Sequence, residues 1–294
     1  MKIFITGATG FVGKCLTELL LKDGHTVAAL VRDKSKASAL SHKGVITVEG
    51  TLTSLGLIRE EASKANAVVH LAFIHDMTKY AEAMKTDGDL IATVIQALKG
   101  TNKPFIITSG GAVLGSVDTP ADESHPVPKG PSRADSEVLA IEGAQQGVGT
   151  IVIRLPTNVY DSTGSGFYKM QAAKAQEKGF AMYTGDGKYE QSNVHVEDAA
   201  AAYVLALQHG KPGSIYHIAS GKHSGKELAE ATARKLGIQS RGISPEEAAE
   251  VYGSLMSIFF ALNIVMDSSK ARRELHWVGR YPASAYFDAI AGTL

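Results

Sequence analysis

Cysteine, net charge and long apolar runs are all scarce in this chain. Cys15 is the single cysteine among 294 residues, which excludes an intramolecular disulfide framework and favours a reducing compartment. The 30 basic and 30 acidic residues cancel, so no overall field favours nucleic acid or an anionic membrane surface. The most apolar stretch outside the predicted core, 255–266, is too short to span a bilayer. Because Met1 leads directly into a strand-like run, we expect no targeting segment and a cytoplasmic protein.

The chain has enough length and apolar content for a large core. Its 294 residues are 44% hydrophobic, which suffices for one domain with a smaller lobe. Strand-like runs are present at 2–6, 26–31, 45–49, 67–72, 104–109 and 149–154. Helix-like stretches alternate with them at 11–23, 34–42, 54–65, 77–100 and 131–147. This alternation predicts an α/β fold with a doubly wound parallel sheet.

Three evenly spaced glycines, Gly7, Gly10 and Gly13, follow the first predicted strand. The order of strand, glycine turn and helix is the context that a dinucleotide-binding fingerprint requires. Gly7 permits a tight turn, Gly10 lets the backbone approach a pyrophosphate, and Gly13 lets the helix pack closely on the strand. The N–H groups at the helix start then face the anion, and they belong to Thr9, Gly10, Phe11 and Val12. The alternative is a glycine turn that serves helix packing alone.

The GxxGxxG spacing resembles the short-chain dehydrogenase/reductase superfamily, in its extended and atypical branches. Further resemblance lies in AVVHLAF at 67–73, IITSGGAVLG at 106–115, VIRLPTNVYD at 152–161 and NVHVEDAAAAY at 193–203. The resemblance covers most of 1–220 and only the outline of the tail, through SSKARRELHW at 268–277. It implies a Rossmann fold that binds a nicotinamide cofactor. It also implies cofactor contacts beyond the glycine turn, from Leu71, Ala72, Phe73, Arg133, Pro156, Asn158 and Val159.

The resemblance and the pattern together give the domain organisation. We expect a dinucleotide-binding Rossmann core over 1–154, to which 191–210 returns. The pattern becomes irregular after Pro156, with loop-rich stretches at 161–169 and 184–192. We therefore assign 155–294 mostly to a substrate-binding lobe.

The end of the second predicted strand indicates which cofactor is preferred. Relatives that prefer NAD carry an acidic residue there, whereas this chain has Val31 followed by Arg32. A guanidinium can bind a 2′-phosphate through paired, charge-assisted hydrogen bonds, and Lys34 and Lys36 add positive charge nearby. The sequence thus favours NADP(H) over NAD(H), unless Arg32 is only a solvated surface residue.

After the third predicted strand the chain departs from its relatives at the adenine position. Relatives often carry Asp-Leu where this chain has Thr51 and Leu52. We keep both residues as predicted adenine contacts.

The catalytic segment also departs from the family pattern. Most relatives carry Ser or Thr after the fifth strand and YxxxK on the next helix, in which Tyr moves the substrate proton and Lys holds the nicotinamide ribose. Here the hydroxyl position is Gly110, with Ser109 just before it, and no tyrosine lies between Tyr80 and Tyr160. Arg133 stands in the place of the lysine and Lys129 in the place of the tyrosine.

These replacements have different chemical abilities. Arg133 can hydrogen-bond ribose hydroxyls but is a poor proton donor, because its pKa stays far above neutral. Lys129 can donate a proton if burial near Arg133 lowers its pKa, or it is a solvated lysine in a loop before the helix. The candidate catalytic residues are therefore Ser109, Lys129, Arg133 and Tyr160, and Tyr168 is a further phenol.

The histidines fall into two groups. His70 lies within an apolar strand and is expected to be a core histidine with its hydrogen bonds satisfied, whereas His75 follows that strand and can face a substrate. His195 and Asp198 lie where the family segment supports the core. No spacing of His, Cys and Asp resembles a metal site.

The resulting functional hypothesis is an NADP(H)-dependent reductase of a small, apolar carbonyl or enone. Two alternatives stay open: a non-redox isomerase on the same scaffold, and a non-enzymatic NADP(H)-binding regulator. The stretch 255–266 either covers an apolar pocket, forms a subunit contact or packs in the core. We expect a small-molecule substrate, no nucleic acid or membrane partner, and a monomer or homodimer.

Overall fold

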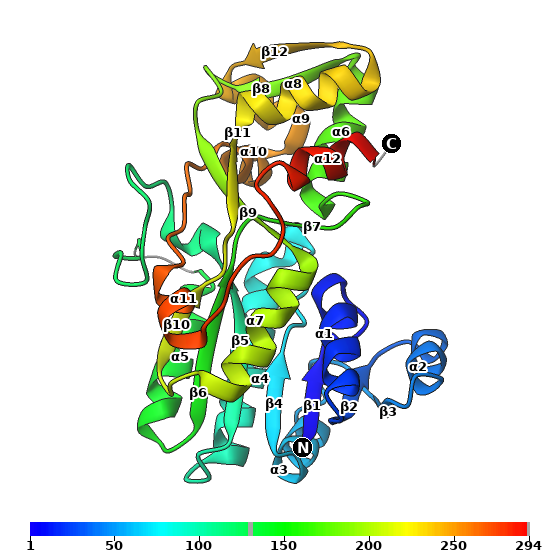
Figure 1. Cartoon of the computed structure of the whole chain (residues 1–294), viewed down its shortest axis with the longest axis vertical. Helices are drawn as coiled ribbons and strands as arrows, with labels where there is room; N and C mark the ends of the chain where they lie inside the picture. Colours follow the sequence, from blue (N-terminus) through cyan, green and yellow to red (C-terminus); the bar gives the residue numbers. More distant parts are fainter. Residues whose placement is uncertain (129–131, 293–294) are drawn as a thin grey trace.

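The computed structural model describes residues 1–128 and 132–292. Its centre, within that part of the chain, is a seven-stranded sheet of order β10-β6-β5-β4-β1-β2-β3 (Figure 1). Every neighbouring pair in this sheet is parallel. The strands are β1 Lys2–Thr6, β2 Thr26–Val31, β3 Ile46–Glu49, β4 Ala67–His70, β5 Pro104–Gly110, β6 Gly149–Leu155 and β10 Ser214–His217.

Helices cover both faces of this sheet, and alternate strand residues fill two cores. Ile3 and Ile5 join one core with α1 (Phe11–Lys22), α7 (Val196–His209) and α11 (Ser269–Leu275). Phe4 joins the other core with α3 (Leu55–Lys64), α4 (Tyr80–Leu98) and α5 (Ala134–Gln145). Successive side chains of a strand point to opposite faces, so a fully buried strand must be apolar on both. The predicted doubly wound α/β fold is confirmed.

The element boundaries differ from the predicted ones in a few places. The strand predicted over 67–72 ends at His70, and the helix predicted over 77–100 is a 3₁₀ turn, η1 (Met77–Lys79), followed by α4. The helix predicted from 131 begins at Ala134 in the described residues. A short helix, α2 (Lys34–Ser41), follows β2, and a second 3₁₀ turn, η2 (Gly111–Leu114), follows β5.

The range assigned to the substrate lobe also contributes to the central sheet. Strand β10 pairs with β6 at the sheet edge, and Trp277, just beyond α11, is buried in the core on the α7 side. The four-residue run of β10 is too short to reveal its position from periodicity alone. The lobe therefore excludes 214–217 and the segment around α11.

Apart from α7, the rest of 155–292 forms small layers beyond the carboxyl ends of the central strands (Figure 1). One layer is a three-stranded sheet of order β11-β9-β7, and the other is the parallel pair of β12 and β8. Its strands are β7 Asn158–Tyr160, β8 Phe180–Thr184, β9 Glu190–His195, β11 Gly221–Ser224 and β12 Gln239–Ile243. Its helices are α6 Gly166–Lys178, α8 Gly225–Leu236, α9 Pro245–Tyr252, α10 Ser254–Ala261 and α12 Ala285–Gly292.

Local signals explain where the lobe helices begin and end. Ser224 and Glu227 form a reciprocal capping box at the start of α8, and Gly237 ends that helix in the left-handed conformation. Ser244 caps α9, whose first residue is Pro245. None of the helices in 1–128 and 132–292 is long and apolar enough to cross a membrane.

The pKa values of two buried histidines predict how the free energy of unfolding depends on pH. Burial, together with the Arg154 charge at His217, lowers the pKa of His217 to about 4, and burial lowers that of His223 to about 4. Unfolded histidine titrates near ~6.5, so below that pH the unfolded chain binds protons that the folded chain does not. Stability is therefore full above pH ~6.5 and falls as the pH drops toward 4, by about 3 kcal/mol for each histidine.

Urea unfolding at several pH values between 7.5 and 4.5 measures this slope. His217→Gln should flatten it, since one of the histidines that take up a proton on unfolding is removed. His209→Gln, at an exposed position, is the matched control and should leave the slope unchanged. A native protein equally stable at pH 7.5 and 5 would contradict the expected proton uptake.

Candidate functional site

The loop between β1 and α1 is compressed on its inner side and open on its outer side. Gly7 has a φ of +83°, and a Cβ there would lie 2.7 Å from the Ala72 nitrogen. A Cβ on Gly13 would lie 2.0 Å from the carbonyl oxygen of Gly7. Gly10 is exposed, donates its N–H to that same oxygen at 2.8 Å, and a Cβ there would approach only this atom, at 3.1 Å. The loop thus offers an open backbone surface at Gly10.

The first turn of α1 continues this open surface. Gly10 is its N-cap residue and provides no side-chain cap, and Phe11 is exposed. The early N–H groups of a helix carry partial positive charge and need acceptors. Such groups favour an anion such as a pyrophosphate, and the contacts from Thr9 to Val12 stay a prediction.

The predicted adenosine side of the site lies where β2 and β3 end. Leu30 pairs with Thr6, so the exposed Arg32 lies at the same edge of the sheet as the glycine loop. The side chains of Lys34 and Lys36 lie outside the described part of the structure. The Thr51 hydroxyl lies 2.9 Å from that of Thr53, and Leu52 packs in part on the core.

On the other side, three side chains gather around Phe73, just beyond β4. The Arg133 guanidinium lies over the Phe73 ring, 4.3 Å from its centroid. The rings of His75 and Tyr80 meet Phe73 edge-on at 5.4 and 6.1 Å. Burial raises the pKa of Tyr80, whereas burial and the Arg133 charge lower that of His75. We call Phe73, His75, Tyr80 and Arg133 the Phe73 cluster.

A chain of buried hydrogen bonds lies beneath the Phe73 cluster. His70 contacts the Thr6 hydroxyl through Nδ1 at 2.5 Å and Asp87 through Nε2 at 3.0 Å. Ser136 donates to the other Asp87 oxygen at 2.6 Å. Because a carboxylate only accepts, His70 carries its proton on Nε2 and accepts from Thr6 at Nδ1. The prediction of His70 as a satisfied core histidine is confirmed.

Two buried polar atoms at this edge have no partner among the described residues: Oγ of Ser109 and Nε of Arg133. Ser109 is 1% exposed at the end of β5. Arg133 is the N-cap residue of α5, and its Nη2 donates to the Thr108 carbonyl. Buried donors are nearly always paired in native proteins. Two unpaired ones at the end of β5 are a local sign of a ligand site.

Several predicted site residues lie elsewhere. The Tyr160 side chain is 1% exposed, with its ring against His195 and Tyr286, and burial raises its pKa to about 12. Tyr168 is fully buried in the same lobe cluster. Neither phenol reaches a surface that a substrate can touch, because apolar and aromatic lobe residues enclose both. This placement argues against Tyr160 and Tyr168 as proton donors.

The predicted nicotinamide-side loop is also packed inside the protein. Asn158 is buried, and its Oδ1 accepts hydrogen bonds from Ser165 at 3.0 Å and Tyr286 at 3.1 Å. Pro156 is buried and Val159 half-buried against the core on the α7 side. Lys129 lies outside the described residues. Leu71 and Ala72 are half-buried and lie beside Gly7, and their cofactor contacts stay a prediction.

His195 and Asp198 tie the C-terminal segment to α7. The His195 ring stacks on Tyr281 at 3.4 Å, and Asp198 accepts the Arg280 backbone N–H at 2.9 Å. The Asp198 carbonyl accepts from Nε1 of Trp277 at 2.9 Å. Their predicted supporting role is confirmed.

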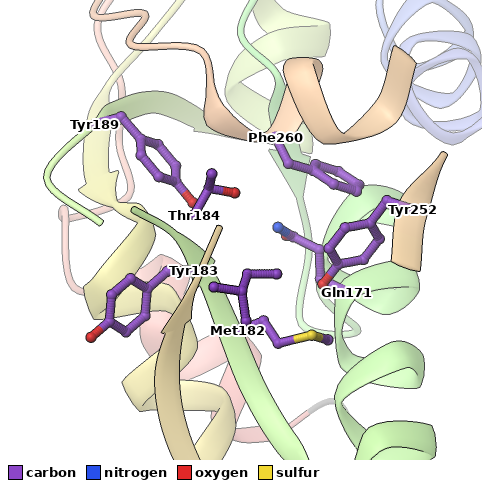
Figure 2. A pocket seen from close by; sticks show the side chains of 8 residues that line it. Gln171, Met182, Tyr183, Thr184, Tyr189, Tyr252 and Phe260 are labelled. Carbon is purple, nitrogen blue, oxygen red and sulfur yellow. The ribbon is translucent and has the colours of Figure 1, made fainter. Parts of the chain in front are cut away.

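The lobe holds one small pocket, between α6, β8, β12, α9 and α10 (Figure 2). Its free volume is about 10 Å³, room for roughly one water. Phe260 from the apolar stretch 255–266 packs there beside Tyr252, so part of that stretch serves core packing. This pocket is too small for a substrate. In 1–128 and 132–292 no group of His, Cys, Asp and Glu is arranged to hold a metal ion.

The site contains two residues that the sequence analysis did not identify, Asp87 and Tyr80. Asp87 had a usable signal, since it interrupts the apolar stripe of α4 formed by Ala83, Leu90, Ile91 and Val94. No sequence pattern indicated Tyr80, because its ring contacts Phe73 only through the turn at Met77–Lys79.

Together, the parallel sheet, the open glycine loop and the lobe at the carboxyl edge define a dinucleotide-binding Rossmann protein. The chain belongs to the NAD dependent epimerase/dehydratase family, whose sequence profile matches residues 3–219. The fold and relatives place it with the extended short-chain dehydrogenases/reductases. This family binds a nicotinamide cofactor.

Named relatives include both uncharacterized proteins and enzymes. The chain is 37% identical over 279 residues to an uncharacterized protein of Schizosaccharomyces pombe, covering 94% of each. It is 26% identical to a 4-hydroxy-2-methyl-3-oxo-4-farnesyl-3,4-dihydroquinoline-1-oxide ketoreductase of Stigmatella aurantiaca, covering 99% of this chain and 96% of that one. Among solved structures, dTDP-glucose 4,6-dehydratase from Streptomyces venezuelae superposes with a TM-score of 0.80 at 21% identity, covering 100% and 95%.

Proposed function

We propose that this protein is an NADP(H)-dependent oxidoreductase that reduces a carbonyl or enone of a small apolar compound. The observation that carries the proposal is the pair of unpartnered buried donors, Ser109 Oγ and Arg133 Nε, beside an open glycine loop. Similarity to a ketoreductase and to a GDP-6-deoxy-D-mannose reductase of Pseudomonas aeruginosa is consistent with it.

The residues present fit a dinucleotide. Gly10 and the first turn of α1 would hold the pyrophosphate, Arg32 the 2′-phosphate, and Arg133 the nicotinamide ribose. The bound nicotinamide would supply the hydride, and the protein would orient it and stabilise the developing oxyanion.

The chain's own donors have distinct tasks. Ser109 can donate its O–H to a substrate carbonyl oxygen, and the Arg133 charge stabilises negative charge there. Arg133 cannot release the proton that the alkoxide needs, since it stays protonated. The side chains left for that step are Ser109, Lys129 and, in the Phe73 cluster, Tyr80 and His75. The aromatic rings of the Phe73 cluster favour an apolar substrate.

The proposal also covers the cellular location and the oligomeric state of the protein. We propose a cytoplasmic protein, because one cysteine and balanced charge suit that compartment. We propose a monomer or homodimer with no nucleic acid or membrane partner.

We predict that the protein binds NADPH at least about tenfold more tightly than NADH, or about 1.4 kcal/mol. Arg32→Ala should remove most of this preference, because the paired guanidinium bonds to the 2′-phosphate are lost. Nucleotide fluorescence titration measures both affinities. Arg59→Ala, at an exposed position on α3, is the matched control. Equal or tighter binding of NADH by the native chain would exclude the NADP(H) assignment.

The experiment that tests the function is NADPH oxidation against a panel of aldehydes, ketones and enones. Arg133→Ala should lower turnover by misplacing the nicotinamide. Lys129→Met should lower turnover by about a hundredfold or more if Lys129 is the general acid. Unchanged turnover in Lys129→Met would move that role to Ser109, Tyr80 or His75.

Other outcomes of the same assay identify the alternatives. Substrate conversion without net NADPH consumption would indicate the isomerase. Tight NADPH binding with no turnover on any carbonyl or enone would favour the regulator and would end the reductase proposal.

A further inference from the structure

A carboxylate interrupts the buried face of α4. Asp87 is 2% exposed and lies among Ala83, Leu90, Ile91 and Val94 on that face. An ionised carboxylate buried without partners costs several kcal/mol. The partners of Asp87 therefore decide what its burial achieves.

Two donors from different elements fix the Asp87 carboxylate. His70 of β4 donates to Oδ1 at 3.0 Å, and Ser136 of α5 donates to Oδ2 at 2.6 Å. Burial raises the pKa of Asp87, but these hydrogen bonds and the nearby Arg133 charge outweigh it, so this pKa lies below its usual value. With both oxygens held from opposite sides, the carboxylate has one fixed orientation.

The charge of this carboxylate is directed at Arg133. Nη2 of Arg133 lies 3.7 Å from Oδ1 of Asp87, and the Arg133 side chain is 15% exposed. The same Nη2 donates to the Thr108 carbonyl, and the guanidinium plane rests on the Phe73 ring. A carboxylate, a carbonyl and an aromatic face thus hold the guanidinium, and its Nε–H is left without a partner in the described residues.

The same hydrogen-bonded chain reaches the glycine loop. Thr6 contacts His70 and directly precedes Gly7, and the Ala72 N–H lies 3.4 Å from the Thr6 hydroxyl. The position of Arg133 is therefore fixed relative to the loop expected to hold the pyrophosphate.

We infer that Asp87 is a positioning residue for the nicotinamide half of the bound nucleotide, acting through Arg133. This inference rests on the proposed function. A buried ion pair is a poor source of stability, since apolar residues of similar volume often stabilise a protein as well or better. It does supply a preorganised donor, because Arg133 keeps its unpaired N–H in one place before the ligand arrives.

Comparing the affinities for two nucleotides distinguishes a loss of positioning at the nicotinamide half from a general loss of structure. NADPH carries the nicotinamide half, whereas 2′,5′-ADP carries only the adenosine half. Asp87→Asn keeps the shape and an acceptor but removes the charge. It should weaken NADPH binding by about tenfold and change 2′,5′-ADP binding by less than about twofold. Asp89→Asn, two residues along α4 at an exposed position, should change neither.

A double-mutant cycle then tests whether Asp87 acts through Arg133. Arg133→Ala should show the same NADPH-specific loss, and the double variant should lose no more than Arg133→Ala alone. Should Asp87→Asn fail to fold, Ser136→Ala removes one restraint on the carboxylate and should weaken NADPH binding by about threefold, with 2′,5′-ADP binding unchanged.

Each contrary outcome has a separate meaning. Unchanged NADPH affinity in a folded Asp87→Asn protein would overturn the inference, as would equal losses for both nucleotides or additive effects in the cycle. A native protein that binds both nucleotides equally well would also overturn it while leaving the adenosine site intact. A native protein that binds neither nucleotide would overturn the proposed function itself.

Discussion

Gly10→Val should abolish nucleotide binding in a protein that still folds, whereas Gly13→Ala should destabilise the fold itself. The Gly10 backbone has φ −76° and ψ 178°, a conformation open to any residue. A side chain there would meet only the Gly7 oxygen at 3.1 Å and would otherwise occupy the exposed surface where a pyrophosphate would approach. We expect the NADPH affinity to fall by at least about a hundredfold, more than 2.7 kcal/mol.

Gly13 differs because its missing Cβ faces backbone. The new Cβ would lie 2.0 Å from the Gly7 oxygen and 2.8 Å from its carbonyl carbon. Neither atom can rotate away, so β1 and α1 must separate and lose buried contacts. A cost of several kcal/mol is expected, as for other overpacked sites.

Urea unfolding and NADPH titration of the two variants distinguish these effects. If Gly13→Ala had the free energy of unfolding of the native protein, β1 and α1 would not be in close backbone contact at Gly13. Retained nucleotide affinity in a folded Gly10→Val protein would make the loop a packing device alone.

The sequence predicted those strands and helices whose pattern lies in neighbouring residues. It did not predict the elements whose place depends on contacts between distant segments. The glycine spacing and the alternation of apolar runs with helix-like stretches over 1–154 predict the central sheet. Strand β10 is four residues long, and its place beside β6 depends on contacts more than 60 residues apart in the chain. Periodicity holds no information about such a contact.

The residues of the candidate site also fall into two groups: those that residue type identifies and those that only tertiary contacts bring together. Gly7, Gly10 and Gly13 are identified by residue type and spacing: Gly7 and Gly13 have no room for a Cβ, and Gly10 leaves the backbone exposed. Asp87 and Tyr80 join the site through tertiary contacts alone. Tyr160 was selected for its phenol, but a phenol also packs well in an aromatic cluster, and the rings of His195 and Tyr286 enclose it.

The missing catalytic hydroxyl is not a consequence of crowding. A Cβ on Gly110 would have only the Leu155 oxygen near it, at 4.0 Å, so a serine there would fit. At Gly111, by contrast, a Cβ would lie 2.6 Å from Sδ of Met266. Ser109, whose buried hydroxyl has no partner among the described residues, lies one residue before Gly110.

Glu137→Ala should lower the free energy of unfolding by about 3–5 kcal/mol, the usual cost of breaking a buried ion pair by removing one partner. Both Glu137 oxygens accept from Arg154, at 2.8 Å from Nε and 2.6 Å from Nη2. The Arg154 side chain is 2% exposed, and its Nη1 lies 3.1 Å from Nε2 of His217. Without Glu137 the guanidinium stays buried, charged and unpaired.

Two further variants show whether the loss of unfolding free energy comes from the buried, unpaired charge of Arg154. Glu142→Ala lies on the exposed face of the same helix, α5, and should change stability by less than about 0.5 kcal/mol. Replacing both partners, as Glu137→Leu with Arg154→Met, should recover most of the loss, because no buried charge remains. Urea unfolding at pH 7.5 gives all three values. A double variant as unstable as Glu137→Ala would show that packing around α5, rather than an unpaired cation, sets the cost.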